Sequence, residues 1–127
     1  MSNLNTIITA KARENMAKGR AGLATLPTIA GMAFGDGGAP GGVPVAPSAG
    51  QTALTNELYR KAITSREMIS TTTCRYSCTL STSELAGESI SEIALYDTNG
   101  DLACIKTFIP KGKDSDTEQT YVIDDAF

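Results

Sequence analysis

Apolar and polar residues alternate with a period of two along residues 71–82. The apolar positions on one side of this alternation are Cys74, Tyr76, Cys78 and Leu80, and mostly Thr and Ser occupy the other side. The alternation, with its β-branched and aromatic content, is typical of a β-strand with one buried face. We therefore predict a strand that covers a core with one face and meets solvent with the other.

Residues 90–109 carry the clearest hairpin pattern in the chain. Two apolar runs flank the sequence DTNGD at 97–101, and its Asn-Gly pair tolerates the positive φ that tight hairpin turns require. Both runs have apolar residues on both faces, as strands buried inside a sheet do. This pattern predicts a β-hairpin at the centre of the sheet.

Two segments have the residue types of short helices. Residues 9–18 are mostly good helix formers, Thr9 can cap the first turn, and Gly19 can end the last one. Residues 51–59 have apolar residues spaced for about two further helical turns. We therefore expect one or two short helices, one of them near the N-terminus.

The remaining segments complete an α+β pattern. Residues 28–34 are apolar and short, which favours a buried strand, and a strand region begins within residues 62–69. A polar loop at 111–119 precedes a last strand at 120–124. The chain is therefore expected to form a single α+β domain over residues 1–127, with a mostly antiparallel sheet.

Gly and Pro dominate residues 35–50, so no regular element is expected there. The segment is either a flexible linker or a binding arm that orders against a partner, with Val43 and Val45 as apolar contacts. Loops of this length in compact domains are more often functional or mobile than incidental.

Composition and charge narrow the class of partner. The chain has 127 residues, of which 41% are hydrophobic and 20% charged, so it can form one modest core. Its formal net charge of -3 gives no attraction to phosphate backbones, and we expect no nucleic-acid partner. No apolar stretch suits a membrane helix, and the N-terminus lacks the residue order of a signal peptide. We therefore expect no membrane partner and synthesis in the cytoplasm.

The residue types argue against an enzyme. The sequence has no histidine, which removes Ser-His-Asp and Cys-His catalysis and His-ligated metal sites. It contains neither a GxxxxGK[ST] phosphate loop nor a GxSxG nucleophile motif. A small enzyme built on Glu and Asp pairs would need carboxylates such as Glu88, Glu92 and Asp97 to converge in one pocket. We expect no catalytic residues and no cofactor.

Two patterns that mimic metal sites have simpler interpretations. Cys74, Cys78 and Cys104 are either a thiolate site or small buried apolar side chains, and their odd number argues against a disulfide framework. On a straight strand Cys74 and Cys78 would stand about 13 Å apart, too far to share one ion. The acidic runs 97–101 and 114–118 lack the Gly and the distant Glu of a calcium-binding EF-hand loop. No metal is therefore expected.

Three sequence blocks resemble the phage tail-collar fibre proteins. The first is TIITAKARENMAKGRAG at 6–22, similar to the family's short N-terminal helix. The second is MAFGDGGAPGGVPVAPSAGQTALTNELYR at 32–60, with a GDG turn after a short strand and then a Pro/Gly loop. The third is the hairpin block ESISEIALYDTNGDLACI at 88–105. Their order and spacing also match the family, over nearly the whole chain.

The resemblance implies a structural role. In that family the domain stands at the N-terminus of a tail fibre and docks the fibre onto the baseplate. Because the sequence ends at Phe127, without a shaft or receptor-binding tip, we expect an adaptor or baseplate-peripheral role rather than host recognition. The expected partners are other tail, baseplate or fibre proteins and further copies of the chain, with a trimer as one option. The expected location is the virion tail, assembled in the cytoplasm of the bacterial host, from a phage, a prophage or a bacteriocin.

A candidate interaction surface follows from these blocks, and the resemblance favours the binding-arm interpretation of the loop. Its residues are Gly35, Asp36, Gly37, Val43, Val45, Glu57, Tyr59 and Arg60. Tyr and Arg are favoured interface anchors. The simpler interpretation is that Glu57 and Arg60 form an ordinary surface ion pair. The alternative function is a small ligand- or carbohydrate-binding module of a phage tail, although the absence of Trp argues against a sugar platform.

Overall fold

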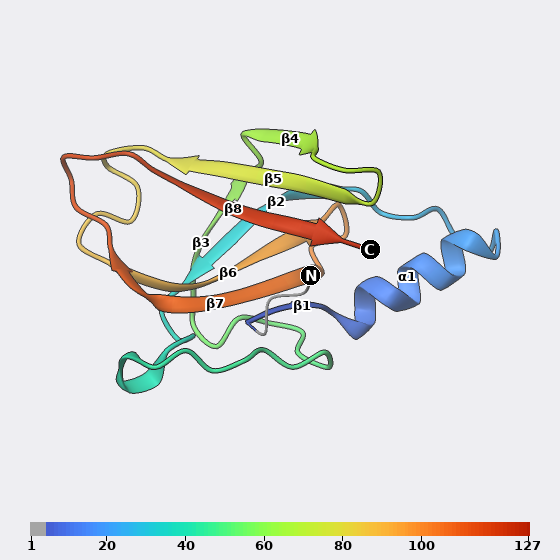
Figure 1. Cartoon of the computed structure of the whole chain (residues 1–127), viewed down its shortest axis with the longest axis horizontal. Helices are drawn as coiled ribbons and strands as arrows, with labels where there is room; N and C mark the ends of the chain where they lie inside the picture. Colours follow the sequence, from blue (N-terminus) through green and yellow to red (C-terminus); the bar gives the residue numbers. More distant parts are fainter. Residues whose placement is uncertain (1–4) are drawn as a thin grey trace.

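The computed structural model describes residues 5–127. Within that range two antiparallel sheets pack face to face (Figure 1). The larger sheet has the strand order β1 (Thr6–Ile8), β7 (Leu102–Gly112), β6 (Ser89–Asp97), β2 (Ile29–Gly35) and β3 (Glu57–Ala62). The smaller sheet has the order β4 (Ser65–Met68), β5 (Thr73–Leu80) and β8 (Gln119–Ala126). The predicted, mostly antiparallel sheet is confirmed.

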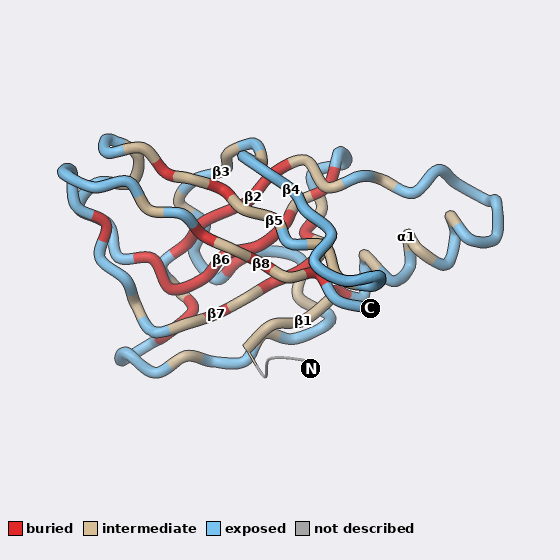
Figure 2. Tube along the Cα trace, turned by 45° about the horizontal axis from the view of Figure 1, so that its top comes forward, coloured by how far each residue is buried: buried red, intermediate tan, exposed pale blue. Residues whose placement is uncertain are grey.

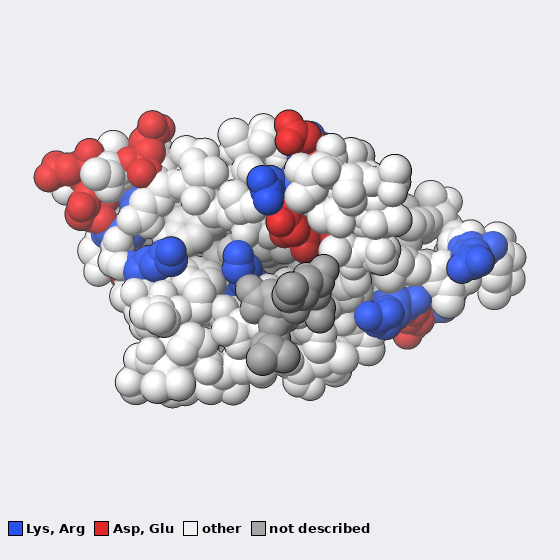
Figure 3. Space-filling view, in the orientation of Figure 1, with Lys and Arg blue, Asp and Glu red and all other residues white. Residues whose placement is uncertain are grey.

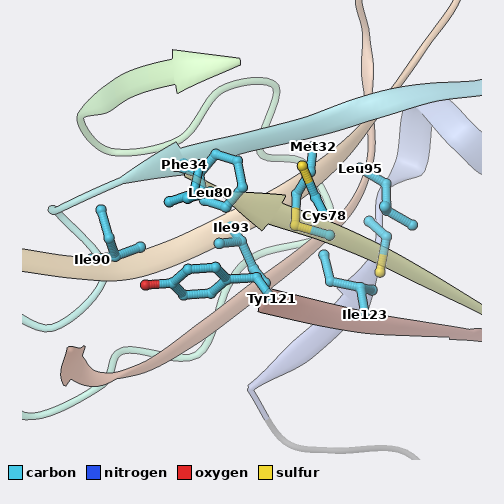
Figure 4. Packing of buried hydrophobic residues seen from close by; sticks show 10 residues of the cluster. Met32, Phe34, Cys78, Leu80, Ile90, Ile93, Leu95, Tyr121 and Ile123 are labelled. Carbon is cyan, nitrogen blue, oxygen red and sulfur yellow. The ribbon is translucent and has the colours of Figure 1, made fainter. Parts of the chain in front are cut away.

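The main core lies between the two sheets (Figure 4). Alternate residues of facing strands point into it, among them Met32 and Phe34 from β2 and Tyr121 and Ile123 from β8. The rings of Phe34 and Tyr121 meet edge to face, with centroids 5.3 Å apart. Burying each such side chain contributes about 1.5–3 kcal/mol, so this layer supplies most of the driving force for folding.

The one-faced strand and the central hairpin are both found where the patterns predict them. On β5, Cys78 and Leu80 are fully buried in the core, as alternation requires. Strands β6 and β7 pair antiparallel around the Asn-Gly turn, where Gly100 has a φ of 84°. β6 lies in the middle of the larger sheet. Of the cysteines, Cys104 joins Cys78 in the core, and Cys74 is half-buried.

The larger sheet is also covered on its outer face, the face turned away from the smaller sheet. A second apolar cluster there consists of Ala33, Leu54, Ala94, Leu102 and Ile105. The β6–β2 and β6–β7 registers contain bulges, one of them between Ile90 and Glu92. A bulge inserts an extra residue, so Ile90 and Ile93 both face the main core while Glu92 faces outward.

The N-terminal helix α1 (Ala10–Arg20) is confirmed with Thr9 as its cap. The amide of Ala12 donates to Thr9 Oγ1 at 3.1 Å, and that hydroxyl donates to the Leu102 carbonyl at 2.7 Å. The predicted end was early, because Gly19 lies inside the helix and the positive φ falls at Gly22. None of the helix residues is buried, and α1 projects from one end of the sandwich (Figures 1 and 2).

The second helix expected at 51–59 is wrong. Residues 57–59 begin the edge strand β3, which pairs with β2 instead of closing helical turns, and residues 51–56 are irregular. Within residues 5–127, α1 is the only α-helix, accompanied by a 3₁₀ turn η1 (Pro40–Gly42). β1 is an unpredicted strand, and β7 runs to Gly112, past the predicted start of the polar loop. The α+β prediction therefore overstated the helical part.

Candidate docking surface

The carboxylate of Glu92 anchors the Gly/Pro-rich chain to the larger sheet. Glu92 is fully buried on β6. It accepts hydrogen bonds from the backbone amides of Gly37 at 2.9 Å, Thr55 at 2.8 Å and Asn56 at 2.8 Å. A buried carboxylate with several amide donors is well satisfied, so both ends of the intervening chain are held at one point.

Glycine is required where the chain passes over β6. A Cβ on Gly38 would lie 2.3 Å from the Ser91 carbonyl oxygen, and one on Gly35 would lie 2.6 Å from Glu92 Oε2. The amide of Gly38 donates to Ser91 Oγ at 3.0 Å. The GDGG sequence is therefore a close-approach site that lets two backbones meet around a buried carboxylate.

Residues 36–56, the arm, then follow the outer face of the larger sheet. Thr107 Oγ1 donates to the Val45 carbonyl at 2.8 Å, and the Ala10 amide donates to the Ala49 carbonyl at 2.7 Å. Leu54 is buried in the outer apolar cluster. The side chains of Val43 and Val45 stay 68% and 57% exposed. The arm is therefore fixed along its backbone while it presents two apolar side chains to solvent.

The edge strand β3 carries the Glu57–Arg60 ion pair. Arg60 Nε donates to Glu57 Oε2 at 2.7 Å, which raises the pKa of Arg60. Its Nη1 also donates to the Gly100 carbonyl at 3.0 Å, and its guanidinium lies 4.9 Å from the centroid of the Tyr96 ring. Arg60 thereby joins the edge strand to the central hairpin turn.

Tyr59 points to the opposite face of β3 from Arg60. Tyr59 pairs across the ladder with Phe34 of the main core, whereas Arg60 pairs with Ala33 of the outer cluster. The Tyr59 hydroxyl donates to Glu84 Oε2 at 2.5 Å. Hydrogen bonds from Lys61, the Ser81 amide and Tyr59 lower the pKa of Glu84 to about 2.

The structure brings together only part of the predicted surface. Gly35 pairs with Glu57 in the β2–β3 ladder, and Asp36 Oδ1 accepts from the Asn56 side chain at 2.6 Å, so the GDG turn and the start of β3 adjoin. Val43 and Val45 lie further along the arm, and Tyr59 lies on the other face of the edge strand. Gly35 is buried, so it shapes the surface without contributing to it.

Sequence reasoning missed Glu92 as the residue that holds this region together. The sequence feature that could have indicated this role is a charged residue inside an apolar strand. Glu92 was considered only together with Glu88 and Asp97, as a possible catalytic carboxylate. Asp97 instead caps the hairpin turn, where its Oδ1 accepts from the amides of Asn99 at 2.9 Å and Asp101 at 3.1 Å.

Charge is distributed unevenly over the molecule. Figure 3 shows acidic side chains at the β7–β8 loop and mostly basic ones on α1, at opposite ends.

Within residues 5–127 no group of three or more His, Cys, Asp or Glu side chains is arranged to hold a metal ion. The candidate surface presents the exposed side chains of Val43 and Val45 and the ion-paired side chains of Glu57 and Arg60.

A family model described as phage tail-collar fibre protein, N-terminal, matches residues 1–122. The chain belongs to this family. The match covers all three resembling sequence blocks, and it confirms the resemblance drawn from them. Neither the curated proteins nor the solved structures give a significant match.

Membership of the tail-collar fibre family makes this chain a structural component of a phage tail. A tail component belongs to the virion and interacts with other tail proteins. The family is structural rather than enzymatic. No helix within residues 5–127 has the length and apolar character to cross a membrane.

Proposed function

We propose that this domain attaches a tail fibre to the baseplate, or serves there as a peripheral adaptor, and that it works as a homo-oligomer. The family match over residues 1–122 carries the proposal. The anchored arm supports it, because a segment already fixed by Glu92 can present Val43 and Val45 with little ordering cost on binding.

The proposed contact surface combines the arm with the adjoining edge strand. Val43 and Val45 supply apolar contacts, and Asp36, Glu57 and Arg60 supply a polar rim beside the arm's base. Gly35 and Gly37 set the path of the backbone between them. Tyr59 contributes only to a partner that wraps around the edge of β3.

Capture of baseplate proteins tests this function. Tagged domain is incubated with isolated tail particles of the phage or prophage that encodes it, and bound proteins are identified by mass spectrometry. We expect baseplate proteins to be retained, and V43D/V45D to lower retention at least about tenfold, because two charges would be placed in the contact. The matched control is S115D, which adds charge at an exposed residue of the β7–β8 loop, outside the arm.

Two outcomes would contradict the proposal. The first is a wild-type domain that retains no tail protein while remaining folded. The second is saturable binding to immobilised glycans without binding to tail particles, which would support the ligand-binding alternative instead.

A further inference from the structure

A pocket of about 200 Å³ lies beneath α1, at the end of the sandwich from which the helix projects. Its walls are mostly apolar and come from several parts of the chain, among them Met16 on α1, Leu26 and Pro27 after it, Ile29 on β2, and Phe127. Leu26 is 48% exposed and Phe127 66% exposed, so apolar surface continues to the rim. The space is large enough for one long side chain.

A buried carboxylate stands at the wall of this pocket. On β8 the core-facing positions are Tyr121 and Ile123, and Asp125 follows them on the same face. Asp125 is only 9% exposed, and within residues 5–127 its carboxylate has no hydrogen bond or ion pair. Burial raises the pKa of Asp125. An unpaired carboxylate at an otherwise apolar position is costly to keep.

A second polar group in the pocket is also without a partner. The side-chain amide of Asn15, on α1, has a buried Nδ2 that forms no hydrogen bond within the described chain. Rotation of this amide about its last bond presents either the nitrogen or the oxygen to the pocket. Asp97 adds another carboxylate to the lining, and none of the described lining residues is Lys or Arg.

An apolar pocket with a carboxylate in its wall suits a side chain that carries a positive charge at the end of an apolar stem. Methylene groups would contact the apolar walls, while the charged head would meet Asp125 and the Asn15 amide oxygen. We propose that the pocket receives a Lys or Arg side chain of a partner protein in the tail. The identity of the partner rests on the proposed function, whereas the chemistry of the pocket does not. The Tyr76 ring in the lining is already faced by Arg66, whose Cζ lies 5.9 Å from the ring centroid, so the polar contacts of the incoming cation are Asp125 and Asn15.

Titration with n-butylguanidinium tests the pocket without any tail protein. Amide chemical shifts of labelled domain are followed as the probe is added, and the neutral control ligand is 1-pentanol. We expect saturable shifts at Ile8, Ala12 and Tyr76 with a Kd of roughly 1–10 mM, as for a ligand of this size. The variant D125N should weaken binding at least about fivefold, because the charge pair is lost. D116N, at an exposed loop residue, should bind as the wild type does.

Two results would overturn the inference. One is an absence of saturable shifts at these residues up to about 50 mM probe, well above the expected Kd. The other is equal affinity for 1-pentanol and for butylguanidinium, with D125N unchanged, which would describe an apolar pocket only. The variant stays interpretable because removal of an unpaired buried charge leaves the fold intact or stabilises it. Failure of baseplate capture with successful probe binding would contradict the proposed function and leave the pocket in place.

Discussion

Two buried carboxylates of this domain have contrasting surroundings. Glu92 accepts three backbone amides and joins both ends of the arm to β6. Asp125 faces an apolar pocket and forms no ion pair or hydrogen bond through its side chain within residues 5–127. The first carboxylate therefore stabilises the fold, whereas the second costs stability in the isolated domain.

Replacement of Glu92 by Gln tests the first role. The amide group of E92Q keeps the shape but replaces one acceptor oxygen with a donor, so at least one buried backbone amide loses its partner. We expect the free energy of unfolding to fall by about 2–4 kcal/mol, measured by urea denaturation. The matched control is E118Q in the exposed β7–β8 loop, which should leave the midpoint unchanged. Equal midpoints for E92Q and wild type would contradict the anchoring role.

Replacement of Asp125 by Asn tests the second role through its pH dependence. Burial raises the folded-state pKa of Asp125 above its ordinary value of 3.8, so the charge costs stability above the folded pKa and the cost disappears as pH falls below 3.8. We expect D125N to be more stable than wild type at pH 7, and the difference to vanish at acid pH. Thermal unfolding across this pH range measures it, and a destabilised D125N at pH 7 would show that the charge has a partner.

Residue types alone predicted part of this picture. Two local patterns predicted features that the structure confirms. They are the alternation that buries Cys78 and Leu80, and the Asn-Gly turn. The role of Glu92 depends on a bulge in β6 and on a segment more than thirty residues earlier in the sequence, so no local pattern contains it. The same holds for Asp125, which looks like part of a solvated acidic terminus until β8 is placed against the core.

At the scale of elements, the arm behaves as a third layer on the sandwich. It covers the outer face of the larger sheet with Leu54 and is fixed by backbone hydrogen bonds at Val45 and Ala49. An irregular segment held in this way keeps a defined path without secondary structure of its own. The predicted helix at 51–59 does not form. Its last residues pair with β2 as part of β3, and Glu92 accepts hydrogen bonds from the backbone amides just before that strand.

A methyl group at Gly38 should detach the arm. The added Cβ of G38A would lie 2.3 Å from the Ser91 carbonyl oxygen, so the backbone must move away from β6. We expect a loss of about 1–3 kcal/mol in unfolding free energy and faster hydrogen exchange at the amides of Thr55 and Asn56. G50A is the matched control, because its Cβ would meet no atom within 4 Å. Unchanged exchange in G38A would mean that the arm is held without the close approach.

At the scale of the whole molecule, two separate groups stand out among the exposed apolar side chains. Val43 and Val45 stand on the arm, and Leu26, Ile69 and Phe127 lie near the α1 end. Figure 1 places η1, next to Val43, and α1 at opposite ends of the molecule. A domain with two such sites can contact one partner at each, as the proposed attachment of a fibre to the tail requires. This division follows from the tertiary fold, and the sequence resemblance alone did not locate it.

The solution mass tests whether one of these sites joins copies of the chain. The protomer has a mass of 13.3 kDa, and we expect light scattering to give a defined multiple of it, with a trimer among the expected closed assemblies. If the arm forms the contact, V43D/V45D should shift the mass to that of one protomer, while L26D should not. The reverse pattern would assign the contact to the α1 end and leave the arm for a tail protein. A monomer at all concentrations would contradict self-assembly, so that docking would depend on unlike partners at both sites.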